Sequence, residues 1–310
     1  MRKDTISLFV FFIAACIVFT PCQAKSKAKH VILIGLDGWG SYSVPKADIP
    51  NIKQLMANGS YTLEKRSALP SSSAINWASM FMGAGPELHG YTEWGSKTPE
   101  LPSRILNKHG IFPTIFQLLR EARPKAEIGC LYEWNGIKYL VDTLALNHYA
   151  QAPNYKEYPE ALCNMAETYI KEKQPTLLAV CFDNPDHIGH QKGHDTPEYY
   201  AKLKELDMYI GRIIRAVEEA GILKETIFII TADHGGINKG HGGKTMQEMQ
   251  TPFIISGKNV KKGMEFHESM MQYDVASTIA YIFGLQQPQV WIGRPMTQVF
   301  KLSLIHISEP

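Results

Sequence analysis

The chain has 310 residues, of which 45% are hydrophobic and 20% are charged, and its 32 basic and 30 acidic side chains leave a formal net charge of +2. This is the composition of an ordinary globular protein, long enough for one large α/β domain or two small ones. The near balance of charge excludes a broad surface for nucleic acid or an anionic membrane, so any recognition of anions must be local.

The first residues predict export. Arg2 and Lys3 precede an apolar run over residues 8–19, which is too short and too early for a membrane span. A small-residue cleavage site at Ala24 makes residues 1–24 a signal peptide, with the periplasm as the destination and no transmembrane span in the mature chain. The alternative is a lipoprotein signal that lipidates Cys16. We favour cleavage at Ala24 because the apolar run continues beyond Cys16.

Strand and helix patterns alternate along the rest of the chain. Three apolar runs lack the alternation of half-exposed strands, which is typical of strands covered on both faces of a parallel sheet. The pattern predicts a doubly wound α/β domain over residues 25–300, with layers of helices around a mostly parallel sheet. In chain order, we expect strands at 30–36, 126–130, 176–182, 226–231 and 252–256, and helices at 51–56, 74–82, 114–121, 158–172, 198–220 and 275–283.

Two irregular stretches interrupt this alternation. Residues 85–112 and 135–155 are richer in Pro, Gly and aromatic residues, so we assign them to loops and to a small cap over the site, within about 85–160. Gly221 is placed to end the long helix, and Asp274 to cap the last one.

The cysteines after the export signal indicate no disulfide framework. Cys130, Cys163 and Cys181 are odd in number and irregularly spaced, so a cysteine zinc site is not indicated either, and we expect buried thiols. Residues 301–310 resemble a translated sequencing adapter, and we exclude this non-native tail from the fold.

An acidic residue follows each of the three main strand runs. Asp37 lies directly behind the first, Asp186 opens an Asp-His-Ile-Gly-His sequence behind the second, and Asp233 and His234 precede two glycines behind the third. Loops after the carboxyl ends of parallel strands share one edge of the sheet, so these side chains are expected to converge. Singly, an Asp-Gly pair after a strand is more often a turn, but the ordered combination favours a site.

Converging carboxylates repel one another, which raises their pKa values unless cations neutralise them. The sequence therefore predicts bound divalent metal ions. Imidazole nitrogen together with carboxylate oxygen suits zinc better than magnesium or calcium, while manganese and iron stay open as alternatives on ligand type.

A run of three serines enters the helix expected at 74–82 and supplies a candidate nucleophile. A hydroxyl at a helix N-terminus lies beside free backbone N–H groups, which suits an incoming phosphate, and metal coordination would lower its pKa. Ser71 or Ser72 can cap the helix while Ser73 reacts, and the run by itself leaves the choice among the three serines open.

In these motifs and in their order, residues 29–285 resemble the alkaline phosphatase superfamily, and most closely the type I phosphodiesterase/nucleotide pyrophosphatase family. The resemblance implies a three-layer α/β/α sandwich that holds two divalent metal ions. It also implies that Ser73 attacks phosphorus in line, that a covalent phospho-enzyme forms, and that metal-bound water hydrolyses it. One ion would be held by Asp37, Ser73, Asp233 and His234, and the other by Asp186, His190 and His241.

Two positions depart from that family. Its diesterases usually carry threonine as the nucleophile, where this chain has Ser73. The family also places an asparagine shortly after a histidine-glycine pair to bind the phosphoryl oxygen, whereas His89 and Gly90 are followed here by Tyr-Thr-Glu-Trp. Asn76 or a backbone N–H is the candidate substitute.

The leading prediction is an exported hydrolase of small phosphate esters or nucleotides, most nearly a phosphodiesterase. Phosphomonoesterase and phosphoethanolamine transferase activities stay open, as does a non-catalytic, metal-stabilised binding protein. A sulfatase is disfavoured because Ile75 and Trp77 stand where it needs proline and arginine. The sequence assigns no oligomeric state.

Other side chains near the motifs have two interpretations. His187 and His194 either support the site from behind or lie in loops, and we favour the loops. Aromatic residues near the motifs either stack on a leaving group or pack in the core: Trp39, Trp77, Tyr91 and Trp94.

Overall fold

One long β-sheet organises the protein. The computed structural model describes residues 26–301, so the predicted signal peptide, Cys16 and tail residues 302–310 lie outside the described part of the chain. Within residues 26–301 the sheet has eight strands: β1 (His30–Leu36), β2 (Gly59–Arg66), β3 (Ile128–Tyr132), β4 (His148–Gln151), β5 (Leu177–Phe182), β6 (Thr226–Thr231), β7 (Gln250–Gly257) and β8 (Met264–Glu265).

The helices connect these strands in the alternation expected from the sequence. Their bounds are α1 (Pro50–Ala57), α2 (Ser73–Met82), α3 (Pro86–His89), α4 (Ile115–Ala122), α5 (Ala161–Lys173), α6 (Asp186–Lys192), α7 (Pro197–Glu219), α8 (Met246–Met249) and α9 (Asp274–Phe283). Gly221 follows the long helix α7 with a φ of +75°, as expected of a residue that ends a helix.

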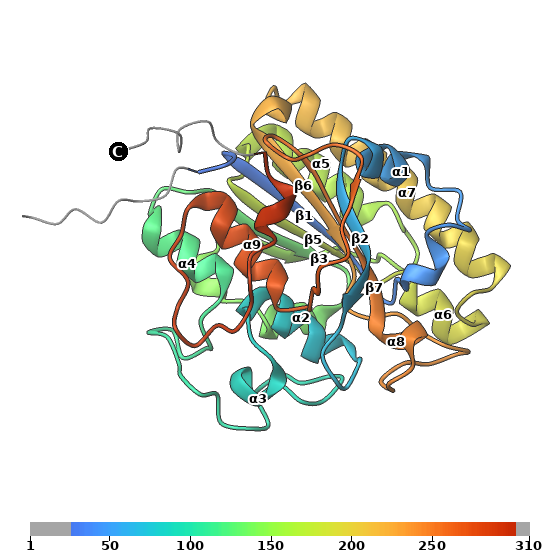
Figure 1. Cartoon of the computed structure of the whole chain (residues 1–310), viewed down its shortest axis with the longest axis horizontal. Helices are drawn as coiled ribbons and strands as arrows, with labels where there is room; N and C mark the ends of the chain where they lie inside the picture. Colours follow the sequence, from blue (N-terminus) through green and yellow to red (C-terminus); the bar gives the residue numbers. More distant parts are fainter. Residues whose placement is uncertain (1–25, 302–310) are drawn as a thin grey trace, which may run out of the picture.

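The sheet is mostly parallel, with strand order β4-β3-β5-β1-β6-β7-β2-β8. β7 runs antiparallel to its neighbours β6 and β2, and the other described pairs are parallel (Figure 1). The order places β1 between β5 and β6. The carboxyl ends of the three strands that precede the acidic motifs are therefore neighbours.

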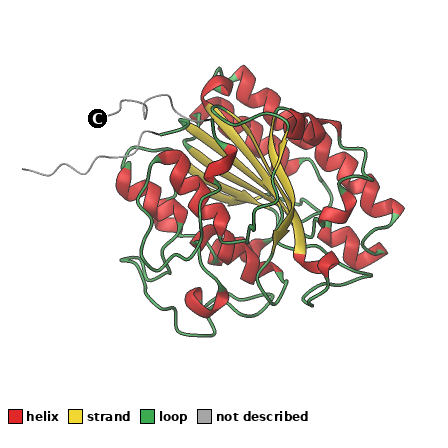
Figure 2. Ribbon diagram, in the orientation of Figure 1, coloured by secondary structure: helices red, strands yellow, loops and turns green. Residues whose placement is uncertain are grey.

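Helices cover both faces of the sheet, which confirms the three-layer α/β/α sandwich (Figure 2). One core lies under α2, α4 and α9, and the other under α1, α5 and α7. Alternate residues of β1 enter opposite cores: Val31 and Leu33 pack on the first, Ile32 and Ile34 on the second. A strand with two buried faces needs an uninterrupted apolar run, and this is why β1, β5 and β6 stood out in the sequence.

Some elements differ from the sequence-based expectation. β4 lies in a stretch assigned to loops and cap, yet it pairs with β3 at the edge of the sheet, where its side chains are largely exposed. β2 was not predicted, because only part of it is buried and its sequence is polar. Asp274 is not the cap of the last helix: it is the first residue of α9, and its carboxylate accepts from the backbone N–H groups of Met271 and Arg294.

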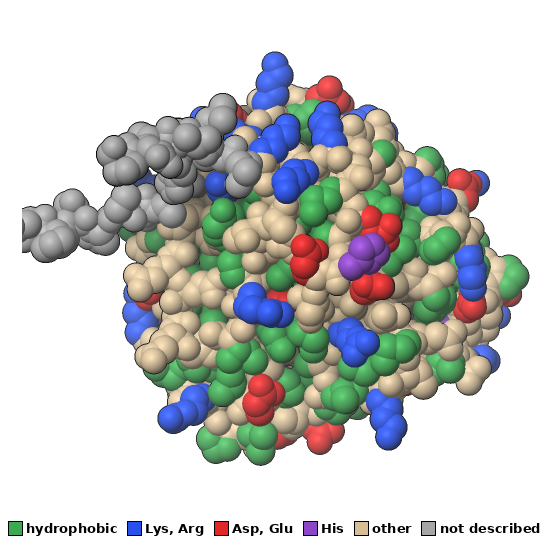
Figure 3. Space-filling model, viewed as in Figure 1, with side chains coloured by type: hydrophobic (Ala, Val, Ile, Leu, Met, Phe, Trp, Pro, Cys, Tyr) green, Lys and Arg blue, Asp and Glu red, His purple; other side chains and the backbone are tan. Residues whose placement is uncertain are grey.

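The three described cysteines, Cys130, Cys163 and Cys181, are buried free thiols, as expected. Basic and acidic side chains are interspersed over the face shown in Figure 3, in keeping with the small net charge. Among the described helices, none combines the length and the apolar character needed to cross a bilayer.

Candidate two-metal site

The acidic motifs meet at the carboxyl edge of the sheet. Asp37 directly follows β1, Asp186 begins α6 shortly after β5, and Asp233 follows β6. The backbone N–H of Asp186 donates to the carbonyl of Asp37 over 2.9 Å, and that of Gly38 donates to Asp233 Oδ1 over 3.1 Å. Asp37, Asp186 and His234 each offer a ligand atom within 4.8 Å of the others. The predicted convergence of the three strand ends is therefore present.

The first group of candidate ligands consists of Asp37, Ser73, Asp233 and His234, and it surrounds His234 Nε2. His234 Nδ1 lies 2.7 Å from the carbonyl oxygen of Gly235, and because a carbonyl only accepts, the ring proton belongs on Nδ1. Nε2 then presents a lone pair. It lies 3.4 Å from Asp37 Oδ1, 3.3 Å from Asp233 Oδ2 and 3.1 Å from Ser73 Oγ.

The two carboxylate oxygens of this group have no hydrogen-bond partner. Asp37 Oδ1 and Asp233 Oδ2 are both buried and unpaired, whereas the second oxygen of each carboxylate is satisfied. Trp77 Nε1 donates to Asp37 Oδ2 over 3.1 Å, and the backbone of His234 donates to Asp233 Oδ1 over 2.8 Å. Buried acceptors that face one another without a donor are costly, and a cation between them removes that cost. This donor set fits a bound metal ion.

The pKa values of the carboxylates in the first group also indicate a place for a cation. Burial and then the negative charge of Asp233 raise the pKa of Asp37 well above its usual range. Burial likewise raises the pKa of Asp233 to about 7. Without a cation these carboxylates compete for protons, so metal binding and proton release are coupled.

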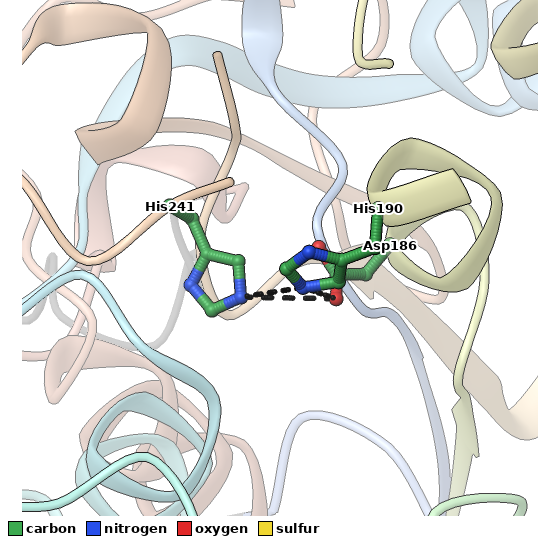
Figure 4. A group of neighbouring side chains, drawn as sticks. All are labelled: Asp186, His190 and His241. Atoms are coloured by element: carbon green, nitrogen blue, oxygen red, sulfur yellow. Dashed lines mark hydrogen bonds and ion pairs between the residues drawn. The ribbon is translucent and has the colours of Figure 1, made fainter. Parts of the chain in front are cut away.

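The second group of ligands lies where α6 meets the loop after β6, and Figure 4 shows its three side chains turned toward one point. Asp186 and His190 are one turn apart on α6, and Asp186 Oδ2 lies 3.0 Å from His190 Nε2 and 3.8 Å from His241 Nε2. His190 Nδ1 donates to the carbonyl of Lys239 over 2.9 Å and His241 Nδ1 to that of Ser71 over 3.1 Å. Both Nε2 atoms therefore point inward, toward Asp186, as metal ligation requires.

Ser73 is the serine that reaches the first group. It is the first residue of α2, and Ser72 precedes it as the N-cap residue in an extended conformation. Ser71 turns elsewhere: its hydroxyl donates to the carbonyl of Gly243 over 2.6 Å and ties the serine loop to the segment behind His241. The three serines are thus distinguished by their contacts, and Ser73 is the one beside His234 Nε2.

Asn76 has different partners from those expected of a phosphoryl ligand. Its side-chain oxygen accepts from the backbone of Ala68 over 2.7 Å. Its amide nitrogen donates to the carbonyls of Ala68, Pro70 and Ser72 over 3.0–3.1 Å. The side chain is fully buried and holds the serine loop in place. Asn76 therefore supports Ser73 from behind and does not point into the site.

His89 also has a structural explanation. Its Nδ1 accepts from the backbone N–H of Tyr91 over 3.1 Å, so Nε2 carries the proton and donates to Ser79 Oγ over 3.0 Å. Burial lowers the pKa of His89 to about 3. Trp39, Trp77 and Tyr91 are buried as well, whereas Trp94 is 68% exposed and its carbonyl accepts from the N–H of Ala74 in α2.

His194 lies in the loop between α6 and α7, as preferred, but it also supports the site from behind. Its side chain is fully buried, and Nε2 lies 3.2 Å from Asp186 Oδ1. Its spacing of four residues from His190 was not a helical signal, because α6 ends at Lys192. His187 is more exposed and pairs with Gln191 on the outer side of α6.

A buried lysine behind Asp233 was also missed. Lys65 on β2 donates from Nζ to the carbonyl of Ala232 over 2.9 Å and to the side chain of Gln272. Burial lowers its pKa to about 7. Lys65 could not be linked to the site from the sequence, because β2 itself was not predicted.

The sheet order, the three layers and a site at the carboxyl ends of the strands define an α/β protein with the alkaline phosphatase fold. Murine ectonucleotide pyrophosphatase/phosphodiesterase 5 has the same fold, with a TM-score of 0.72 and 14% identity, covering 88% of this chain and 100% of that chain. At the level of sequence, the model of the type I phosphodiesterase/nucleotide pyrophosphatase family matches residues 31–117 and 123–247. The chain therefore belongs to this family.

Curated relatives show the range of the similarity. Mouse bis(5'-adenosyl)-triphosphatase enpp4 is 24% identical over 225 residues, which cover 69% of this chain and 48% of that protein. The human catalytic subunit of GPI ethanolamine phosphate transferase 2 is 28% identical over 170 residues, which cover 50% of this chain and 17% of that protein. The match thus spans less than half the length of either relative.

Proposed function

We propose that this protein hydrolyses small phosphate esters through a phospho-serine formed on Ser73, with two divalent metal ions, most nearly as a phosphodiesterase or nucleotide pyrophosphatase. The observation that carries the proposal is the position of Ser73 Oγ, 3.1 Å from His234 Nε2 and beside two unpaired carboxylate oxygens. A nucleophile at this point shares its environment with the first group of metal ligands. A serine that only caps a helix does not require a histidine and two unpaired carboxylate oxygens beside its hydroxyl.

The residues divide into two sets of ligands. Asp37, Ser73, Asp233 and His234 would hold one ion, and Asp186, His190 and His241 the other. The mixture of imidazole nitrogen and carboxylate oxygen favours Zn²⁺, with Mn²⁺ as the alternative. When bound, such ions neutralise the phosphate and lower the pKa of a coordinated hydroxyl.

The chain's own residues position the reacting groups. Ser73 loses its proton, and Oγ bonds to phosphorus as the bond to the leaving-group oxygen breaks. Water then attacks phosphorus, the Oγ–P bond breaks, and Ser73 regains a proton. Trp77 fixes the Asp37 carboxylate, and the backbone of Gly38 and His234 fixes that of Asp233. The N-terminal end of α2 adds a positive dipole at Ser73.

The relatives support two candidate substrate classes. Similarity to the mouse bis(5'-adenosyl)-triphosphatase supports a nucleotide as the substrate. Similarity to the human ethanolamine phosphate transferase supports a phosphoethanolamine ester. Phosphomonoester hydrolysis and phosphoethanolamine transfer are the alternatives on the same site. A protein of another class, which binds metal without catalysis, would need the ligands but not Ser73.

Export to the periplasm belongs to the same proposal. The basic and apolar N-terminal residues support a signal peptide over residues 1–24, with lipidation of Cys16 as the alternative. The N-terminus of the mature protein, read by mass spectrometry after expression with the signal, distinguishes them: a chain that starts near Lys25 supports cleavage, and a lipidated Cys16 supports the alternative.

Substitution of Ser73 tests the catalytic proposal. Ser73→Ala is expected to lower hydrolysis of bis-p-nitrophenyl phosphate, p-nitrophenyl phosphate and a nucleotide by a factor on the order of 10³ or more, because the variant lacks the hydroxyl beside His234 Nε2 that would form the ester. Ser72→Ala is the matched control, and it should keep most of the activity. Equal rates for Ser73→Ala and the parent, with zinc supplied, would refute the covalent mechanism.

A further inference from the structure

His194 is a buried histidine at the second group that the proposed function leaves without a role. Its side chain has no exposed area, and its Nε2 lies 3.2 Å from Asp186 Oδ1. Asp186 Oδ2, the other oxygen of this carboxylate, faces His190 and His241. The two oxygens of Asp186 are therefore divided between His194 on one side and the two imidazoles on the other.

The space around His194 is built for its ring. A Cβ atom at Gly189 would lie 2.4 Å from His194 Nε2, and one at Gly236 would lie 2.3 Å from the ring. The ring also packs against His190 and Tyr199, with centroid distances of 6.2 and 5.6 Å. Glycines on α6 and on the loop after β6 thus leave a slot that the imidazole fills.

His194 also contacts the loop that carries His241. The backbone N–H of His194 donates to the carbonyl of Asn238 over 2.6 Å, and Nδ1 lies 3.2 Å from the same oxygen. Asn238 belongs to a tight turn closed by a bridge between Ile237 and Gly240, and His241 follows directly. His194 therefore touches both halves of the second group, which come from α6 and from the loop after β6.

We propose that His194 is a positioning residue for the second metal ion, a role that rests on the metal centre of the proposed function. By donating from Nε2 to Asp186 Oδ1, it orients the carboxylate so that Oδ2 points at His190 and His241. By donating from its backbone N–H to the carbonyl of Asn238, it also helps to position the loop that carries His241. Groups that orient metal ligands in this way typically change metal affinity by about 10–100-fold when removed.

The experiment compares variants at this position by zinc titration against a chromophoric chelator, with His241→Ala used to assign which binding step belongs to the second group. His194→Phe keeps a ring in the slot but cannot donate to Asp186. It is expected to weaken the second step by about 10–100-fold and to leave the first step unchanged. His194→Gln places an amide N–H near the position of Nε2, and it is expected to restore most of the lost affinity.

His187→Phe is the matched control, because His187 is a nearby histidine on α6 that pairs with Gln191 on the outer side of the helix, and it should leave both steps unchanged. If His194→Phe binds the second ion as tightly as the parent, or if His194→Gln is as weak as His194→Phe, the proposal is wrong. Should His194→Phe fail to fold, His194→Asn replaces it: its amide is too short to reach Asp186, so affinity equal to that of His194→Gln overturns the proposal.

The outcomes also separate this inference from the proposed function. If the parent protein binds no zinc, both the proposed two-metal function and the role of His194 are refuted. A parent that binds two ions and hydrolyses phosphate esters, together with an unaffected His194→Phe variant, removes only the role of His194. Loss of the second step in His194→Phe alongside full activity of Ser73→Ala removes the covalent mechanism and keeps the positioning role.

Discussion

His190 Nε2 and His241 Nε2 lie 3.2 Å apart, and both face Asp186 Oδ2, at 3.0 and 3.8 Å. Each ring donates from Nδ1 to a backbone carbonyl, His190 to Lys239 and His241 to Ser71. Because Nδ1 of both rings is occupied, Nε2 is the atom of each that can bind a cation, and a divalent ion bound there would displace any proton held between Nε2 and Asp186. This relationship supports the proposal that the second group binds a metal ion, because three candidate ligand atoms from two segments of the chain face one point.

Removal of His241 should therefore cost one metal ion and not the fold. We expect His241→Ala to contain about one divalent ion per chain where the parent contains two, and to lose most hydrolytic activity, since the remaining ligands are too few for tight binding. Metal analysis by mass spectrometry after dialysis gives the stoichiometry. His267→Ala, at an exposed histidine far from the ligands in sequence, is the control and should keep both ions. Two ions per chain in His241→Ala would show that this histidine is not a ligand.

Asn76 should matter for stability more than for phosphate binding. Asn76→Ala leaves the buried N–H of Ala68 and several carbonyls without a side-chain partner, so the free energy of unfolding is expected to fall by about 2–3 kcal/mol. Urea unfolding measures this change. Inhibition by inorganic phosphate, measured below the unfolding transition, should stay within a few-fold of the parent. Unchanged stability together with much weaker phosphate inhibition would instead support direct contact with the phosphoryl group.

His89 should make the protein sensitive to acid. Its folded-state pKa of about 3 is below the ordinary value of 6.5, so between these values the unfolded chain binds a proton that the folded chain does not. Stability from this group is present above about pH 6.5 and is lost as the pH falls toward 3, by at most about 1.4 kcal/mol per pH unit. We expect the stability difference between the parent and His89→Gln to shift in favour of the variant between pH 7 and pH 4.5. Urea unfolding at both pH values tests this, and a difference independent of pH would contradict it.

Asp233 should have the opposite effect in the metal-free protein. Its folded-state pKa of about 7 is above the ordinary value of 3.8, so the contribution of Asp233 to stability is fully present below pH 3.8 and is lost as the pH rises to about 7. In the presence of chelator, Asp233→Asn is therefore expected to gain thermal stability relative to the parent as the pH rises from 5 to 8. Added zinc should reverse the order, because the parent then gains the binding energy of a ligand that the variant lacks. Thermal unfolding with chelator and with zinc measures both effects. The same midpoint difference at pH 5 and pH 8 with chelator would show that the Asp233 carboxylate is not destabilised by burial.

The sequence by itself determined the frame of the site. β1, β5 and β6 were predicted because strands buried on both faces need continuous apolar runs, and the acidic residues behind them were predicted to converge because parallel strands end at one edge. Those are local signals joined by one rule of topology. The same signals identified Ser73, Asp186 and His234, which the structure brings together.

The tertiary structure alone decided the contacts that depend on segments far apart in the chain. His194 is buried only because glycines on α6 and behind β6 leave room for it, and Asn76 is occupied only because the loop from Ala68 to Ser72 folds back over it. β2 and β4 have too few buried residues to show a strand pattern in the sequence. They are strands because they pair with β7 and β3, respectively. Burial and hydrogen-bond partners are properties of the folded neighbourhood, and the pattern of a single segment does not contain them.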